Sequence, residues 1–266
     1  MTFFDLSVDA GVATITLTQP TMPPAFFAAI EGAFDELAGR DEVRAVVVRS
    51  VGKGFSYGLD LPAAFAELGE LFSPTAGAAA RRDLLAVIRK WQGAFVAISR
   101  SPVPVIAAVH GWCIGGGLDL ATACDLRLAS SDARFSLRET RVAMVADLGS
   151  LQRLPRIVGQ GNARRMAFTG EDVGAERALA MGLVEQVTDG RDALHAAADA
   201  LARTIAAQSP LAVRGAKHLL DREVAPAVAE GLDYVATWNA AFIASEDLGE
   251  ALAAFVEKRP PVYRGR

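Results

Sequence analysis

The chain has 266 residues, of which 52% are hydrophobic and 22% charged, as in globular proteins and unlike disordered ones. Its formal net charge of −4 leaves no evident basic face for nucleic acid. Two cysteines, Cys113 and Cys124, are too few for a disulfide scaffold and indicate a reducing compartment.

No signal in the sequence points to export or to a membrane. The N-terminal segment MTFFDLSVD has no basic region, and the C-terminal VYRGR matches no familiar retention or peroxisomal signal. The longest apolar stretch, residues 102–118, is too short and too rich in glycine to cross a bilayer. We therefore expect a soluble, cytoplasmic protein without a membrane partner.

Strands and helices alternate in the first half of the chain. Alternating apolar residues over 2–18 predict a hairpin that turns at 9–11, and a helix is expected over 26–37. The run VRAVVVRS at 43–50 predicts a buried strand, and a glycine loop follows at 52–58. A long amphipathic helix is indicated by the spacing of five apolar residues: Leu84, Ile88, Trp91, Phe95 and Ile98.

The second half begins with strands and ends with helices. A mobile loop is expected at 69–80, a buried strand at 102–109, and a short helix after the glycines that follow that strand. Three further strands are predicted by LRLAS, RFSL and LVEQV, the last over 183–187. The sequence thus predicts an α/β region of repeated strand–strand–helix units, residues 1–191, and a helical region, residues 192–266.

Two glycine loops follow buried strands. In GWCIGGGLDL, the glycines let the backbone approach a ligand, and the helix behind them offers free N–H groups to a developing oxyanion. The alternative is a tight turn with no ligand, since glycine turns are common. The loop GKGFSYGLDL could supply a second donor to the same carbonyl oxygen.

Three acids stand near these loops in the sequence. Asp119 lies in the first turn of the helix after the glycines, where its negative charge could simply stabilise the partly positive N-terminus of that helix. Glu139 follows a strand and could be a solvated surface charge, whereas Asp147 lies in the apolar stretch VAMVADLGSL and could cap a helix beginning near Leu148. Three acids at one pocket would instead suit proton transfer.

Other chemistries lack their motifs. The three histidines and two cysteines form no metal-binding pattern, and neither a G-x-S-x-G elbow nor a dinucleotide fingerprint occurs. We therefore expect no metal and no cofactor.

The long segment SPVPVIAAVHGWCIGGGLDLATACDLRLASSDARFSL, with FSYGLDL upstream, resembles the crotonase (enoyl-CoA hydratase/isomerase) superfamily. The resemblance implies a spiral of ββα units, an acyl-CoA substrate and a C-terminal helical region that builds homotrimers or homohexamers. It also implies an oxyanion hole made by the amides of Leu59 and Gly116. The residues that it places against the CoA thioester are Ser56, Tyr57, Gly58, Asp60, Gly115 and Gly117.

Within the superfamily, the combination of Asp119, Glu139 and Asp147, with ADLGSLQRLPRIVG and GLDYVATWN, is most similar to Δ3,5-Δ2,4-dienoyl-CoA isomerases. The likeness implies that Asp147 takes a proton from C2 of a 3,5-dienoyl-CoA and that Glu139 delivers one to C6. Asp119 would then tune the pair. The alternatives are a 2-enoyl-CoA hydratase of fatty-acid β-oxidation and a non-catalytic binding protein. The chain departs from the family pattern at Tyr57, where a small residue is usual, and in lacking an asparagine after its early proline.

The C-terminal helices carry more apolar residues than a small helical cap can bury, which usually marks an interface. The residues concerned are Leu232, Val235, Trp238, Phe242 and Ile243.

Overall fold

The computed structural model describes residues 2–73 and 75–266, and its chain begins with the predicted hairpin. Strand β1 (Phe4–Asp9) pairs antiparallel with β2 (Val12–Leu17). Ala10 and Gly11 form the turn at φ values of 46° and 81°, the left-handed conformation that two-residue hairpins use.

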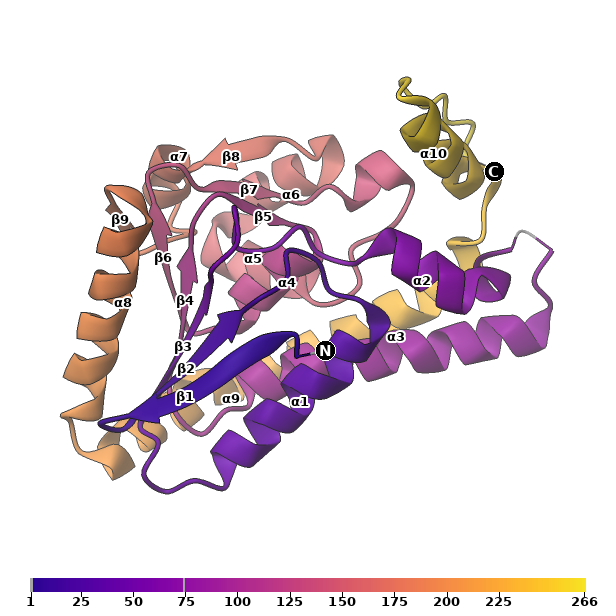
Figure 1. The fold of residues 1–266 in the computed structure, drawn as a ribbon. Helices are drawn as coiled ribbons and strands as arrows, with labels where there is room; N and C mark the ends of the chain where they lie inside the picture. The colour runs from indigo at the N-terminus through magenta and orange to yellow at the C-terminus, as the bar shows by residue number, and fades with distance from the viewer. Residues whose placement is uncertain (1, 74) are drawn as a thin grey trace.

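The main sheet continues in parallel from this hairpin, in the order β1-β2-β3-β4-β6-β9 (Figure 1). Its other strands are β3 (Ala45–Ser50), β4 (Val105–Val109), β6 (Leu126–Ser130) and β9 (Gln186–Thr188). The predicted strand at 183–187 therefore begins three residues late. Leu183 and Val184 pack in the core instead, next to α7 (Ala175–Ala180).

Helices cover both faces of this sheet, which explains why its strands are continuously apolar (Figure 1). Ala45 and Val47 point towards α8 (Gly190–Ala206), whose Leu194, Ala198 and Ala202 are fully buried. The alternate side chains, which point to the other face of the sheet, pack against α1 (Pro24–Ala38) and α3 (Ala78–Ser99). There the rings of Phe27 and Trp91 stack with their centroids 4.8 Å apart.

A second, three-stranded sheet has the order β5-β7-β8. Its strands are β5 (Trp112–Ile114), β7 (Arg134–Ser136) and β8 (Asp172–Gly174). Only β7 was expected, because β5 and β8 have three residues each and show no periodicity. The predicted short helix is α4 (Gly116–Ala123), which starts directly after β5.

The segment expected to be a loop at 69–80 contains helical structure. A 3₁₀ turn, η1 (Gly69–Phe72), continues α2 (Leu61–Leu68), and α3 already begins at Ala78. The turn is held by Phe72, whose ring lies 5.0 Å from that of Phe65. Within that segment, residue 74 lies outside the described residues.

The chain between β7 and β8 contains three helical elements. They are η2 (Glu139–Val142), α5 (Ser150–Ile157) and α6 (Gly159–Thr169). The C-terminal helices are α9 (Pro210–Phe242), which packs along α3, and α10 (Glu246–Glu257), which stands at the edge of the molecule near α2 (Figure 1). No helix in the described ranges is both long and apolar enough to cross a membrane.

The apolar surplus of the C-terminal helices is smaller than the sequence suggested. Leu232, Val235 and Ile243 are buried within the chain, against α3 and its neighbours, so they form no outer surface. Trp238 and Phe242 remain 45% and 60% exposed, with their rings 4.7 Å apart. The exposed apolar residues of this region also include Leu219, Leu220, Tyr234, Phe255 and Val256.

Candidate active site

The two glycine loops lie side by side because the chain before Leu59 runs along β5. Ser56 forms a parallel bridge with Cys113: its N–H donates to Trp112 O at 3.0 Å, and its carbonyl accepts from Ile114 N at 2.9 Å. This register brings the amide of Leu59 next to that of Gly116.

The approach is so close that it requires glycine. A Cβ atom on Gly58 would lie 2.7 Å from Ile114 O and 2.8 Å from Gly116 N, and the residue has a φ of +80°. A Cβ atom on Gly117 would lie 2.7 Å from Ser56 O. The predicted ligand-binding glycines therefore also allow the two loops to touch.

The amides of Leu59 and Gly116 form a pair of free donors. Neither N–H donates to a backbone carbonyl in the described parts of the chain. Gly116 is the first residue of α4, where the partial positive charge of the helix N-terminus adds to the field. A negatively charged oxygen between these amides would receive two hydrogen bonds, the arrangement of an oxyanion hole.

Asp119 is the most deeply buried of the three acids, with 1% of its surface exposed. It lies in the first turn of α4, and its Oδ1 accepts a 2.6 Å hydrogen bond from Ser150 N at the start of α5. Burial raises the pKa of Asp119 to about 6, although this hydrogen bond and the positive charge of Arg153 oppose the rise.

Glu139 stands at the start of η2, close to the glycine loop, and is not the solvated surface charge that the sequence allowed. Its Oε1 lies 3.2 Å from the position that a Cβ atom on Gly115 would take, and its buried Oε2 has no hydrogen-bond partner within the described part of the chain. Burial raises the pKa of Glu139 well above its usual range, and the negative charges of Asp119 and Asp147 raise it further. This environment favours the protonated, neutral form of the Glu139 carboxyl.

Asp147 is held by amide side chains from two helices. Asn239 on α9 donates through Nδ2 to Asp147 Oδ2 at 2.7 Å and to Val145 O at 2.8 Å. Gln92 on α3 donates to Asp147 O at 2.7 Å and to Leu232 O at 2.9 Å. Burial raises the pKa of Asp147 to about 7, while the Asn239 hydrogen bond opposes the rise.

The interpretation of Asp147 as a helix cap is wrong. Helix α5 begins at Ser150 with Gly149 before it, at a φ of 127°. A Cβ atom at Gly149 would collide with the Arg153 guanidinium, so this tight turn requires glycine. The carboxylate of Asp147 therefore accepts a hydrogen bond from Asn239 and does not cap α5.

The structure brings all three predicted acids together: each of Glu139 and Asp147 has its pKa raised by the charge of Asp119. Three supporting residues escaped the sequence reasoning, namely Gln92, Arg153 and Asn239. The only signal for them was a polar side chain at a position that helical periodicity buries. Gln92 falls one residue after Trp91 in the apolar stripe of α3.

The other predicted substrate-binding residues differ in what they can offer. Ser56 is buried, and its hydroxyl accepts from Gly58 N at 3.1 Å. Asp60 caps α2 by accepting from Ala63 N at 3.0 Å and also binds Thr21 Oγ1 at 2.9 Å. The side chain of Tyr57 is exposed.

Among the described residues, no group of three or more histidine, cysteine or acidic side chains could hold a metal ion.

Comparison with known proteins decides the family. The model of the enoyl-CoA hydratase/isomerase family matches residues 7–266. The chain belongs to this family. It is therefore an enzyme of the crotonase superfamily, as the motifs predicted.

Similar curated proteins and solved structures agree with this assignment. The chain is 41% identical over 257 residues to a Δ3,5-Δ2,4-dienoyl-CoA isomerase, mitochondrial, of Dictyostelium discoideum, covering 95% of this chain and 87% of that protein. It is 39% identical over 261 residues to the peroxisomal Δ3,5-Δ2,4-dienoyl-CoA isomerase of Arabidopsis thaliana, covering 97% and 94%. A crystal structure of an enoyl-CoA hydratase from Mycobacterium avium subsp. paratuberculosis superposes with a TM-score of 0.85 at 25% identity over 99% of both chains. The predicted crotonase-like α/β fold is thus confirmed.

The expected cytoplasmic location is contradicted by these names. The Dictyostelium relative is called mitochondrial and the Arabidopsis relative peroxisomal. Composition and the lack of a familiar signal misled the prediction, because organelle addresses are short segments that leave no trace in the folded body.

Proposed function

We propose that this enzyme is a Δ3,5-Δ2,4-dienoyl-CoA isomerase. The observation that carries the proposal is the third acid, Asp147, which lies in the same cluster as Asp119 and Glu139 and is held there by Asn239. Curated relatives with this name support it. The substrate is then an acyl-CoA thioester, and the chemistry uses only carboxyl groups and backbone amides.

The reaction moves one proton across a conjugated system. The thioester oxygen binds the amides of Leu59 and Gly116, which stabilise the negative charge that develops when C2 loses its proton. Asp147, with a pKa of about 7, takes that proton. The electron pair of the broken C2–H bond forms the C2–C3 double bond, and the diene shifts from positions 3 and 5 to positions 2 and 4.

Glu139 completes the reaction as the acid. Because burial and the neighbouring acids raise the pKa of its carboxyl and so favour the protonated form, Glu139 is suited to deliver a proton to C6, where the shifted electron pair ends. The product leaves with Asp147 protonated and Glu139 ionised, so protons must be exchanged before the next turnover. Asp119 touches neither carbon in this scheme; its charge raises the pKa of both partners.

Hydration of a 2-enoyl-CoA is the second candidate, and solved structures named enoyl-CoA hydratases favour it. Hydration needs two carboxyl groups that position one water molecule, which Asp119 and Glu139 can provide. It leaves no task for Asp147. A panel of 2-enoyl-CoA and 3,5-dienoyl-CoA substrates, followed by ultraviolet absorbance, separates the two functions: turnover of enoyl substrates alone would refute the isomerase.

The substrate contacts, domains and assembly complete the proposal. The loop residues 56–58 and 60, with Gly115 and Gly117, would border the CoA thioester. Residues 1–191 would carry this site and residues 192–266 would mediate a homotrimer or homohexamer, through exposed residues such as Trp238 and Phe242. Light scattering tests the assembly, and a particle of 28.0 kDa would contradict it.

A further inference from the structure

A cavity of about 550 Å³ is lined by the C-terminal end of α3 and the residues after it, by Arg153 on α5, and by residues 214–232 of α9. None of the three acids lines it. Its volume is within the range of about 300–1,000 Å³ that small-molecule sites occupy.

The inner walls of this cavity are apolar. Val96 comes from α3, and the buried Val228 and Leu232 come from α9. A ligand that fills it must therefore present hydrocarbon to these side chains, because a fully polar ligand would lose its hydration without compensation.

Four guanidinium groups also line the cavity, those of Arg100, Arg153, Arg214 and Arg222. Among the described residues, none of them lies within ion-pair distance of a carboxylate, whereas eleven arginines elsewhere do. The cavity is therefore positively charged in a protein whose net charge is −4.

Two of these groups have hydrogen-bond donors without acceptors. Arg153 is only 7% exposed; its Nη1 donates to Leu148 O at 3.3 Å, but its buried Nη2 has no hydrogen-bond partner among residues 2–73 and 75–266. The buried Nε of Arg214 also has none. A buried donor left unpaired costs about 1–3 kcal/mol, so an acceptor supplied by a ligand is favourable here.

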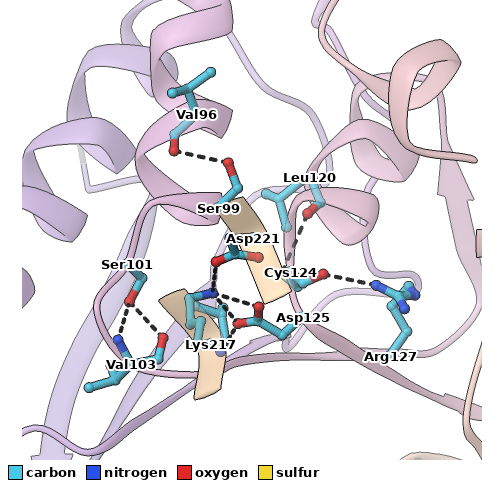
Figure 2. Close-up of polar contacts among 11 residues, drawn as sticks. Val96, Ser99, Ser101, Val103, Leu120, Cys124, Asp125, Arg127, Lys217 and Asp221 are labelled. Carbon is cyan, nitrogen blue, oxygen red and sulfur yellow. Dashed lines mark hydrogen bonds and ion pairs between the residues drawn. The ribbon is translucent and has the colours of Figure 1, made fainter. Parts of the chain in front are cut away.

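The other charges at and beside the cavity are one ammonium and two carboxylates, which together leave one negative charge. Lys217 lies 2.5 and 2.6 Å from the two carboxylate oxygens of Asp125 and 3.8 Å from Asp221 (Figure 2). Asp221 is the one acid that lines the cavity, and it faces Lys217 rather than a guanidinium. The imidazole of His218 also lines the cavity. Four guanidinium groups exceed this one negative charge, so the cavity stays positively charged, although the charge of Asp119 offsets part of that of Arg153.

We propose that this cavity is a second ligand site, separate from the acyl-CoA site, and that it binds a medium-chain carboxylate. The carboxylate completes the hydrogen bonds of Arg153 and Arg214, since a guanidinium pairs with a carboxylate through parallel N–H donors. The hydrocarbon chain lies along Val96, Val228 and Leu232.

Calorimetric titration with octanoate tests the site on the full-length protein, with saturating butyryl-CoA present to occupy the acyl-CoA site. We expect one octanoate per chain, bound at least about tenfold more tightly than neutral octanol, because only the carboxylate pairs with the arginines. Inorganic phosphate, which lacks the apolar chain, should bind more weakly than octanoate. Octanol or phosphate binding as tightly as octanoate would contradict the proposal.

Variants locate the site. Arg214→Gln, which replaces a partly exposed side chain on α9, should weaken octanoate binding about tenfold. Arg203→Gln, an exposed position on α8 outside the cavity, should leave the affinity unchanged. The proposal is overturned if the wild type fails to bind octanoate at millimolar concentration, if Arg214→Gln binds like wild type, or if butyryl-CoA displaces octanoate. If butyryl-CoA itself does not bind, the proposed function fails, but the octanoate titration still decides this inference.

Discussion

Asn239 and Asp147 are joined by a 2.7 Å hydrogen bond between Nδ2 and Oδ2, although 92 residues separate them in the chain. Asn239 is 2% exposed, and the same Nδ2 donates to Val145 O, which fixes the backbone before the acid. The C-terminal helix α9 therefore positions the group that we assign as the base. Because an amide donor favours the ionised carboxylate, it also keeps the pKa of Asp147 from rising further.

Replacing Asn239 should change the pKa of Asp147 while leaving the carboxyl group in place. In Asn239→Ala, the pKa of Asp147 should rise by about one unit, because a hydrogen bond to a charged group is worth about 1.5–3 kcal/mol. The acidic limb of the profile of kcat against pH should move upward by the same amount. Asn162→Ala, which removes an amide bonded to Val158 O on α6, is the matched control and should leave the profile unchanged. An unshifted limb in Asn239→Ala would show that the amide has no role at the acid.

The contact between the glycine loops should tolerate no side chain at Gly117. A Cβ atom there would lie 2.7 Å from Ser56 O, so Gly117→Ala must push the loops apart. Overpacking of this kind costs about 1–3 kcal/mol of stability, and the displaced amides of Leu59 and Gly116 should lower kcat. Gly161→Ala on α6, where a Cβ atom meets nothing within 4 Å, provides the control. Chemical denaturation and steady-state kinetics give both readouts; wild-type kcat in Gly117→Ala would contradict the oxyanion assignment.

The buried acids should make the protein less stable as the pH rises. Asp147 has a pKa of about 7 in the folded state, against 3.8 for an ordinary aspartate. The folded state therefore binds more protons between these values, and stability falls as the pH increases from about 4 to about 7. Asp147→Asn removes this penalty and should be about 1–2 kcal/mol more stable than wild type at pH 8, after allowance for its partial exposure.

Thermal unfolding at two pH values measures this effect. The melting temperature of Asp147→Asn should exceed that of wild type at pH 8 and equal it at pH 4, where both side chains are neutral. If the two melting temperatures are equal at pH 8, the ionised carboxylate of Asp147 does not destabilise the folded state, and the prediction is wrong.

The ion pair of Lys217 with Asp125 should anchor α9 to the sheet region (Figure 2). Lys217 is buried, and Asp125 Oδ2 also accepts from Val105 N at 2.7 Å at the start of β4. Lys217→Met leaves Asp125 without its cation, a change that costs about 3–5 kcal/mol when a buried pair is broken. Denaturant unfolding should show this loss, whereas Lys258→Met near the C-terminus should show none. A stable Lys217→Met would mean that apolar packing alone holds α9.

Sequence reasoning recovered those parts of the molecule in which local pattern and tertiary structure agree. The stripe from Leu84 to Ile98 is the buried face of α3, and the glycines of both loops lie where their motifs placed them. Asp119, Glu139 and Asp147 were recognised because their motifs lie within 29 residues of chain, even though each carboxyl taken alone had an ordinary interpretation.

The parts that escaped depend on distant partners. Gln92 and Asn239 look like ordinary helix residues, and only the packing of α3 against α9 turns their amides towards Asp147. Strands β5 and β8 have three residues each and form only because β7 lies between them. Leu232 and Val235 lie on one helical face of α9, and the sequence pattern does not tell whether α3 or another copy of the chain covers that face.

The central claim is that Asp147 removes the proton from C2, and the turnover of Asp147→Asn with a 3,5-dienoyl-CoA tests it most directly. The change is nearly isosteric, so butyryl-CoA should bind as it does to wild type. We expect kcat to fall by about a hundredfold to ten-thousandfold, the usual contribution of a general base. Glu139→Gln should fall similarly and Asp119→Asn less. Full isomerase activity in Asp147→Asn, or a wild type that only hydrates crotonyl-CoA, would contradict the account.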